Sequence, residues 1–142
     1  MLRRVLTVVT IAALTLSSSS EARADFTWEC GHADVSCRGL MNDLVTQKFT
    51  ARFAHDRYAI QVYAETTRFD QGDGVTMAIV GVVPRARGTH AHMPNRIWRV
   101  VTYHARVGDA YERQQKSRNA IRRAVENMMA SCDDSPSCDI LD

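Results

Sequence analysis

The sequence predicts a two-layer α+β fold in the order αβββα: an N-terminal helix, a three-stranded antiparallel meander and a long C-terminal helix. Three observations support it. Apolar residues spaced three and four apart precede residue 50, alternating residues fill the middle of the chain, and a capped amphipathic segment follows residue 108. Helices and a meander in this order pack as two layers around one core.

The first helix is expected over residues 36–50, with Asp34 or Ser36 as its N-cap. Gly39 weakens its first turn because glycine is a poor helix former. The apolar positions expected to share one face are Cys37, Leu40, Met41, Leu44, Val45 and Phe49. Such a stripe is typical of a helix that packs on a core.

Two strands are expected to form a hairpin. Residues 58–65 alternate as a half-buried strand does, and the Asp-Gln-Gly-Asp-Gly segment at 70–74 is a turn signal. Residues 76–83 are nearly all apolar or β-branched. They predict a middle strand covered on both faces, with Ile79 in the core, and Pro84 should end it.

A third strand is expected over residues 96–105, and a long helix after it. The strand alternates, so that Trp98, Val100 and Thr102 would face one way and Ile97, Val101 and Tyr103 the other. Asp109 and Glu112 form a capping-box pattern at the start of the helix. The core stripe of this helix is predicted to be Ile121, Ala124, Val125, Met128 and Cys132.

Residues 1–24 have the pattern of a secretory signal peptide. Arg3 and Arg4 precede an apolar run over 5–16, and Ala22 and Ala24 occupy the small-residue positions before the expected cut. A membrane anchor would need about 20 apolar residues. We therefore expect a mature chain of residues 25–142, folded as a single domain without a transmembrane anchor and exported to the periplasm or the exterior.

Four cysteines, at positions 30, 37, 132 and 138, are typical of two disulfides in an exported chain. Their spacing does not match that of a zinc knuckle. The expected fold places Cys37 and Cys132 at opposite ends of the domain, too far apart to bond. The local pairs Cys30–Cys37 and Cys132–Cys138 are therefore predicted.

Removal of the signal peptide leaves a mature chain with equal numbers of acidic and basic side chains, because it takes away three arginines and one glutamate. Such a chain lacks the overall positive field of a nucleic-acid-binding protein. No nucleic-acid partner is therefore expected.

The segment 84–96 is the candidate binding site. Its candidate residues are Arg85, Arg87, His90, His92 and Arg96, and it contains no acid. Long loops in small domains are often functional. Three interpretations compete: a solvated loop, a contact for an acidic partner, and a copper or zinc site through the two histidines, which would need further ligands.

No catalytic motif is present, although His104 could act as a base at the end of the third strand. The sequence therefore favours a non-enzymatic exported protein that binds another macromolecule. It would act as an inhibitor, an immunity-type protein or an accessory factor of secretion or assembly, without a cofactor. The alternatives are a small secreted enzyme with a histidine base and a histidine-loop metal-binding protein.

Overall fold

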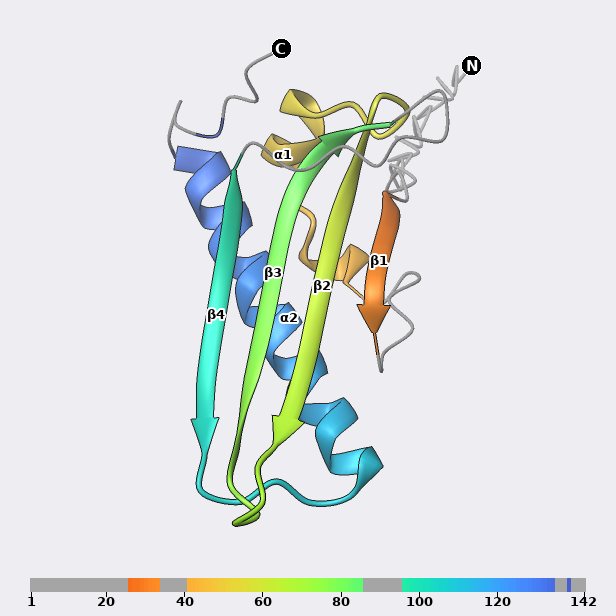
Figure 1. The fold of residues 1–142 in the computed structure, drawn as a ribbon. Helices are drawn as coiled ribbons and strands as arrows, with labels where there is room; N and C mark the ends of the chain where they lie inside the picture. Colours follow the sequence, from red (N-terminus) through yellow and green to blue (C-terminus); the bar gives the residue numbers. More distant parts are fainter. Residues whose placement is uncertain (1–25, 34–40, 86–95, 135–137, 139–142) are drawn as a thin grey trace, which may run out of the picture.

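The computed structural model describes residues 26–33, 41–85, 96–134 and 138. The chain forms an α+β fold with a four-stranded sheet in the described part (Figure 1). The elements are β1 (Thr27–Ala33), the 3-10 helix η1 (Asn42–Leu44), α1 (Gln47–Arg52), β2 (Tyr58–Arg68), β3 (Gly74–Pro84), β4 (Ile97–His104) and α2 (Ala110–Asp134).

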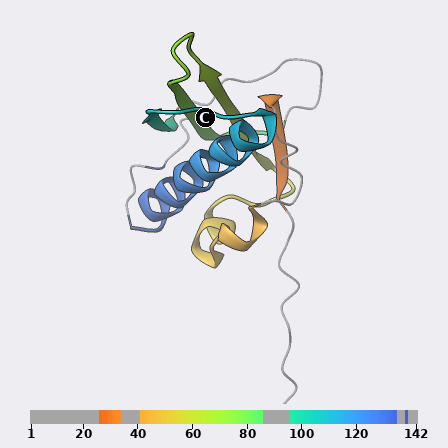
Figure 2. The same ribbon diagram turned by 90° about the horizontal axis from the view of Figure 1, so that it is seen from below.

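The strands lie in the order β1-β2-β3-β4. Strands β2, β3 and β4 pair antiparallel as the predicted meander, whereas β1 pairs parallel with β2. Helix α2 crosses one face of the sheet diagonally, and α1 lies on the same side (Figures 1 and 2).

The core lies between the sheet and α2. Alternate residues of β2 and β3 face the helix, and among them Ile60 and Val80 are fully buried. The predicted stripe of α2 is also buried: Ile121, Ala124, Val125, Met128 and Cys132. Phe49 and Phe53 close the end of the core beside α1, with ring centroids 4.9 Å apart.

The prediction of a continuous helix over 36–50 is wrong. Residues 34–40 lie outside the described residues, and the rest of the segment holds only η1 and the six-residue α1. Val45 is extended between them, and Thr46 caps α1 by accepting a hydrogen bond from the Phe49 amide at 3.1 Å. The helical spacing arose because Met41, Val45 and Phe49 are all buried, although no single helix carries them.

Strand β1 is a feature that the predicted fold lacks. The apolar alternation at its start is short, because it consists of Phe26, just before the strand, and Trp28, which are both buried. The Trp28 indole donates a hydrogen bond to the side chain of Asn42. The strand is held by parallel pairing with β2, about thirty residues further along the chain. Such a long-range pairing leaves little local signal in the sequence.

The prediction that β3 is covered on both faces holds at the end of the strand near Val83, which is buried, but fails at its middle. Val80 faces α2 and is fully buried, but Ile79 faces the other side and is only partly buried. Ile79 lies directly opposite Tyr63, and paired residues share a face of the sheet. Gln61 lies two residues before Tyr63 in β2, so it is on that face as well. The described helices lie on the α2 side, and this leaves the second face of β3 accessible at its middle.

The predicted start of the long helix is confirmed. The Asp109 carboxylate accepts a hydrogen bond from the Glu112 amide at 2.9 Å, and Lys116 pairs with Glu112 at 2.9 Å. The predicted Cys132–Cys138 disulfide is present, with α-carbons 5.0 Å apart. Cys30 is disulfide-bonded as well. Its predicted partner, Cys37, lies outside the described residues, so that pairing stays a prediction.

Candidate functional site

The predicted basic loop is described only at its two ends. Arg87, His90 and His92 lie outside the described residues. Arg85 is exposed, and its side chain donates a hydrogen bond to the His55 carbonyl at 3.3 Å. The Arg96 guanidinium lies over the Trp98 ring, 5.2 Å from its centroid. The role of the loop as a binding site therefore stays a prediction.

A second candidate site is the sheet face turned away from α2, here called the open face. Its side chains form cross-strand rows: Gln61–Gly81–Ile97, Tyr63–Ile79–Arg99, Glu65–Met77–Val101 and Thr67–Val75–Tyr103. Ala59 and Val83, at one end of this face, are buried. The middle is partly open, and it is mostly apolar along β3.

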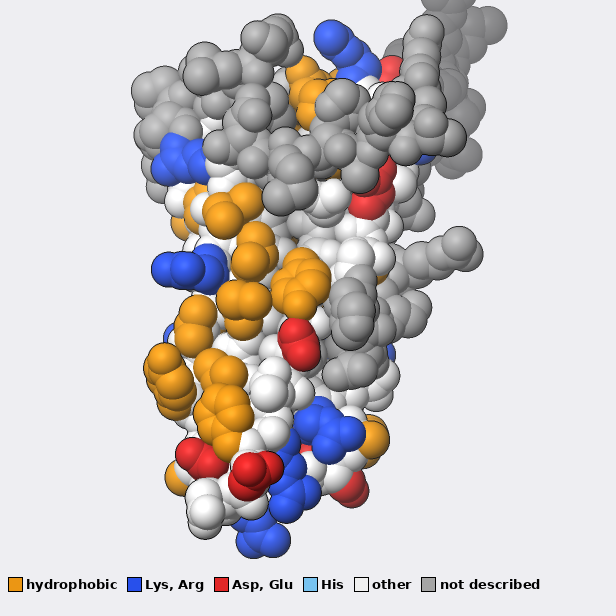
Figure 3. Space-filling model, viewed as in Figure 1, with side chains coloured by type: hydrophobic (Ala, Val, Ile, Leu, Met, Phe, Trp, Pro, Cys, Tyr) orange, Lys and Arg blue, Asp and Glu red, His pale blue; other side chains and the backbone are white. Residues whose placement is uncertain are grey.

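Exposed apolar side chains continue this face onto β4. Ile97 is 50% exposed, Val101 44% and Tyr103 81%. Figure 3 shows an apolar band on this face, over the region of β3 and β4. A contiguous apolar patch of this kind commonly marks an interaction site, whereas scattered apolar side chains do not.

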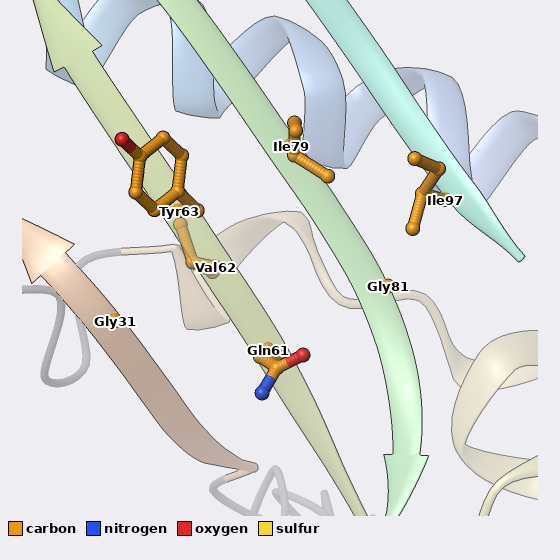
Figure 4. A pocket seen from close by; sticks show the side chains of 7 residues that line it. All are labelled: Gly31, Gln61, Val62, Tyr63, Ile79, Gly81 and Ile97. Carbon is orange, nitrogen blue, oxygen red and sulfur yellow. The ribbon is translucent and has the colours of Figure 1, made fainter. Parts of the chain in front are cut away.

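A hollow of about 410 Å³ lies in the open face (Figure 4). Its lining residues are Gly31, Gln61, Val62, Tyr63, Ile79, Gly81 and Ile97. Two of them are glycines, so the hollow lies where side chains are missing from β1 and β3. At Gly31 an added β-carbon would meet no atom within 4 Å. The hollow can therefore receive an apolar group.

Charge is distributed unevenly around the apolar band. The sequence has no Asp or Glu between Asp73 and Asp109, and the arginines in that stretch are Arg85, Arg87, Arg96, Arg99 and Arg106. Arg99 is exposed on β4, in the same row as Tyr63. Glu65, on the β2 side, accepts a hydrogen bond from the Tyr63 hydroxyl at 2.8 Å. Figure 3 shows Lys or Arg side chains along the upper and middle part of the β4 border, and Asp or Glu side chains at the lower end of the band.

His104, the candidate base, contacts a row of hydroxyl groups under the sheet. Its Nε2 lies 2.8 Å from the Thr76 hydroxyl, which lies 2.8 Å from that of Thr66, which in turn lies 2.8 Å from that of Ser117. Thr76 and Ser117 are fully buried. A substrate cannot reach these hydroxyls, so the row serves to satisfy buried polar groups.

Burial lowers the pKa of His104 below its ordinary value of 6.5, and the positive charge of Lys116 lowers it further. The Glu112 carboxylate opposes this shift, but its effect is the smallest of the three. His104 is therefore neutral at neutral pH, which suits its hydrogen bond to Thr76.

The described part of the chain holds no group of three or more metal-ligating side chains. It also contains no helix that is both long and apolar enough to span a bilayer. The histidines proposed for a metal site, His90 and His92, lie outside it.

Neither the family models nor the curated proteins include a match to this sequence. Among solved structures, the chain is similar to a Caulobacter crescentus protein provisionally described as a lipoprotein, with 14% sequence identity and a TM-score of 0.37. The alignment covers 75% of this chain and 87% of that one. A TM-score this low does not establish a common fold, so the likeness indicates neither fold nor function here.

Sequence reasoning missed the β4 residues as a candidate site. The sequence predicted that Ile97, Val101 and Tyr103 share one side of the strand, but it did not show whether that side is covered or exposed. The useful signal is positional. The last strand of a meander lies at a sheet edge unless a further strand joins it, so its outer backbone groups stay unpaired.

Proposed function

We propose that this protein is exported and non-enzymatic, and that it binds another protein through the β4 surface, defined as Ile97, Arg99, Val101 and Tyr103 together with the adjoining hollow. One observation supports this most: three exposed apolar side chains alternate with an arginine on a single strand and continue into an apolar hollow. The Cys132–Cys138 disulfide is consistent with export, because disulfides persist in oxidising compartments.

The chemistry of this surface favours an acidic partner with apolar side chains. Arg99 is flanked by apolar residues, and its stretch of the chain offers no carboxylate of its own. A one-signed border steers a partner of opposite charge and weakens as salt increases. The predicted loop residues, with Arg85 and Arg96 at its described ends, would extend the same basic border. An inhibitor, an immunity-type protein and an accessory factor of secretion or assembly would all act through such a surface.

The alternative of a histidine-based enzyme has one observation in its favour, the short contact between His104 and the Thr76 hydroxyl. That hydroxyl is fully buried, however, and is bonded to a second buried hydroxyl. A nucleophile must be reachable by the reacting group of the substrate. Among the described residues, the exposed apolar row with Arg99 lies on the opposite face of the sheet, which supports binding over catalysis.

Site-specific photo-cross-linking in the native host tests the proposal. A photoreactive side chain replaces Tyr103 in one variant and Arg123, which is exposed on α2, in a matched control. We expect one protein adduct from position 103, weakened by high salt, and none from position 123. Adducts from position 123 alone, or none from position 103, would contradict the proposal.

A further inference from the structure

The outer edge of β4 offers a row of backbone groups for pairing. Within the described residues, β4 pairs only with β3, and the register runs without interruption from Gly74–His104 to Gly81–Ile97. The strand contains neither proline nor lysine, which commonly protect exposed edges. An eight-residue regular edge of this kind can accept a further strand.

The opposite edge of the sheet is less suited to pairing. The β1 register shifts between Gly31 and Ala33, and such a shift interrupts the ladder. Exposed Glu29 adds a negative charge there, and Cys30 is tied into a disulfide. Irregular and charged edges resist strand addition, so β4 is the better acceptor.

The direction of the backbone groups on β4 follows from its geometry. Successive residues of a strand direct their N–H and C=O groups alternately to one side and the other. In Figure 1 the open face is toward the viewer, β4 runs downward and β3 lies to its right. For L-residues in a strand of this direction, each residue whose side chain points to the viewer directs its N–H and C=O groups to the left, away from β3. Ile97, Arg99, Val101 and Tyr103 therefore present both side chain and backbone to an added strand.

Charge decides between a second copy and a different partner. Self-pairing of β4 would bring Arg96, Arg99 and Arg106 of two copies to one edge, and the stretch from 74 to 108 contains no acid to neutralise them. Like charges across a strand pair are destabilising, and opposite charges are favourable. The basic edge therefore fits an acidic strand better than it fits itself.

We propose that an extended acidic segment of the partner adds to the sheet as a new strand along β4. The inference rests on the proposed function and specifies how the partner binds. Residues directly opposite one another share a face, so the segment carries a carboxylate beside Arg99 and apolar side chains two residues before and after it, near Ile97 and Val101. The recognised pattern is apolar, any residue, acidic, any residue, apolar.

The probe for this inference is a fluorescent synthetic peptide in which valine, threonine, glutamate, threonine and valine follow one another, flanked by threonines. Binding at low salt is measured by fluorescence anisotropy. Arg99→Glu should weaken binding at least about tenfold, a loss typical of a broken charge pair at an interface. A peptide with lysine in place of glutamate should restore it. Arg123→Glu, the same charge change on α2, should leave binding unchanged.

The backbone part of the inference is tested with Val101→Pro. Proline removes an outward N–H while the bonds to β3 remain, so the fold should persist in circular dichroism, as proline is tolerated at sheet edges. Both peptides should then fail to bind. Absence of binding by the wild-type protein, or full binding by folded Val101→Pro, would overturn the inference. If Val101→Pro does not fold, the Arg99→Glu variant decides: the inference fails if the lysine peptide does not restore binding to that variant.

The photo-cross-link at position 103 separates the two proposals. If the adduct forms equally well in the Val101→Pro background, the open face binds a partner without strand addition, and only the inference fails. If no adduct forms from position 103, the proposed function itself fails. A dimer in sedimentation that dissociates on Val101→Pro would show that a second copy occupies the edge, and would overturn the choice of an acidic partner.

Discussion

At the scale of single residues, neighbouring side chains on one strand have opposite environments. Val80 is fully buried under α2, whereas Ile79 lies on the open face beside the hollow. Both are β-branched and apolar, so the sequence alone could not tell which face of β3 is covered. Only the placement of the helices on one side of the sheet decides it.

Two matched truncations test this assignment. Ile60 and Ile79 are the same residue type on adjacent strands, but only Ile60 is fully buried. Ile60→Ala should lower the free energy of unfolding by about 2 to 5 kcal/mol, because it leaves a cavity in the core. Ile79→Ala should cost about half of that or less, measured by denaturant unfolding. Equal losses would mean that the open face is covered in the folded protein.

His104 provides a pH-dependent contribution at the same scale. Its pKa is lowered in the folded state by burial and by Lys116, so the unfolded chain binds the proton more readily. Its contribution to stability is therefore complete above the ordinary value of 6.5 and is lost as pH falls below it.

Thermal unfolding between about pH 5 and about pH 8 measures this effect. His104→Gln keeps a hydrogen-bonding group near Thr76 but does not titrate. We expect the variant to lose less stability in acid than the unsubstituted protein. The other histidines are common to both chains, so identical pH profiles would show that His104 contributes nothing.

At the scale of elements, prediction succeeded where the signal was local. The meander of β2, β3 and β4 follows from alternation and from the turn at 70–74, and the start of α2 from Asp109 and Glu112. It failed for β1, whose pairing is long-range, and for residues 41–53, where buried apolar residues three and four apart belong to η1, α1 and the connection between them. Apolar spacing reports burial, and a helix is only one way to achieve it.

The candidate site shows the same limit at the element scale. The sequence drew attention to the basic loop, of which Arg85 and Arg96 are described. The exposed row on β4 depends instead on where the strand lies in the sheet and on which face the helices cover. Neither property is encoded within the strand itself, so these residues could be recognised only from the fold.

At the scale of the whole molecule, the described fold is asymmetric. One sheet face is covered by α2 and packed into a core, while the middle of the other is partly open and continues onto an unpaired, basic edge. The Cys132–Cys138 disulfide secures the end of α2, and the Arg52 side chain donates a hydrogen bond to the Cys132 carbonyl at 3.1 Å. The core side is therefore built for stability, and the β4 side is available for binding.

Amide hydrogen exchange, with and without the acidic peptide, tests the central claim that β4 binds a partner. In the free protein, the outward amides of Arg99, Val101 and Tyr103 should exchange rapidly, because no described strand pairs with them. We expect the peptide to slow exchange at these three positions and to leave α2 unchanged. Protection confined to α2, or no change on β4 at saturating peptide, would contradict the account.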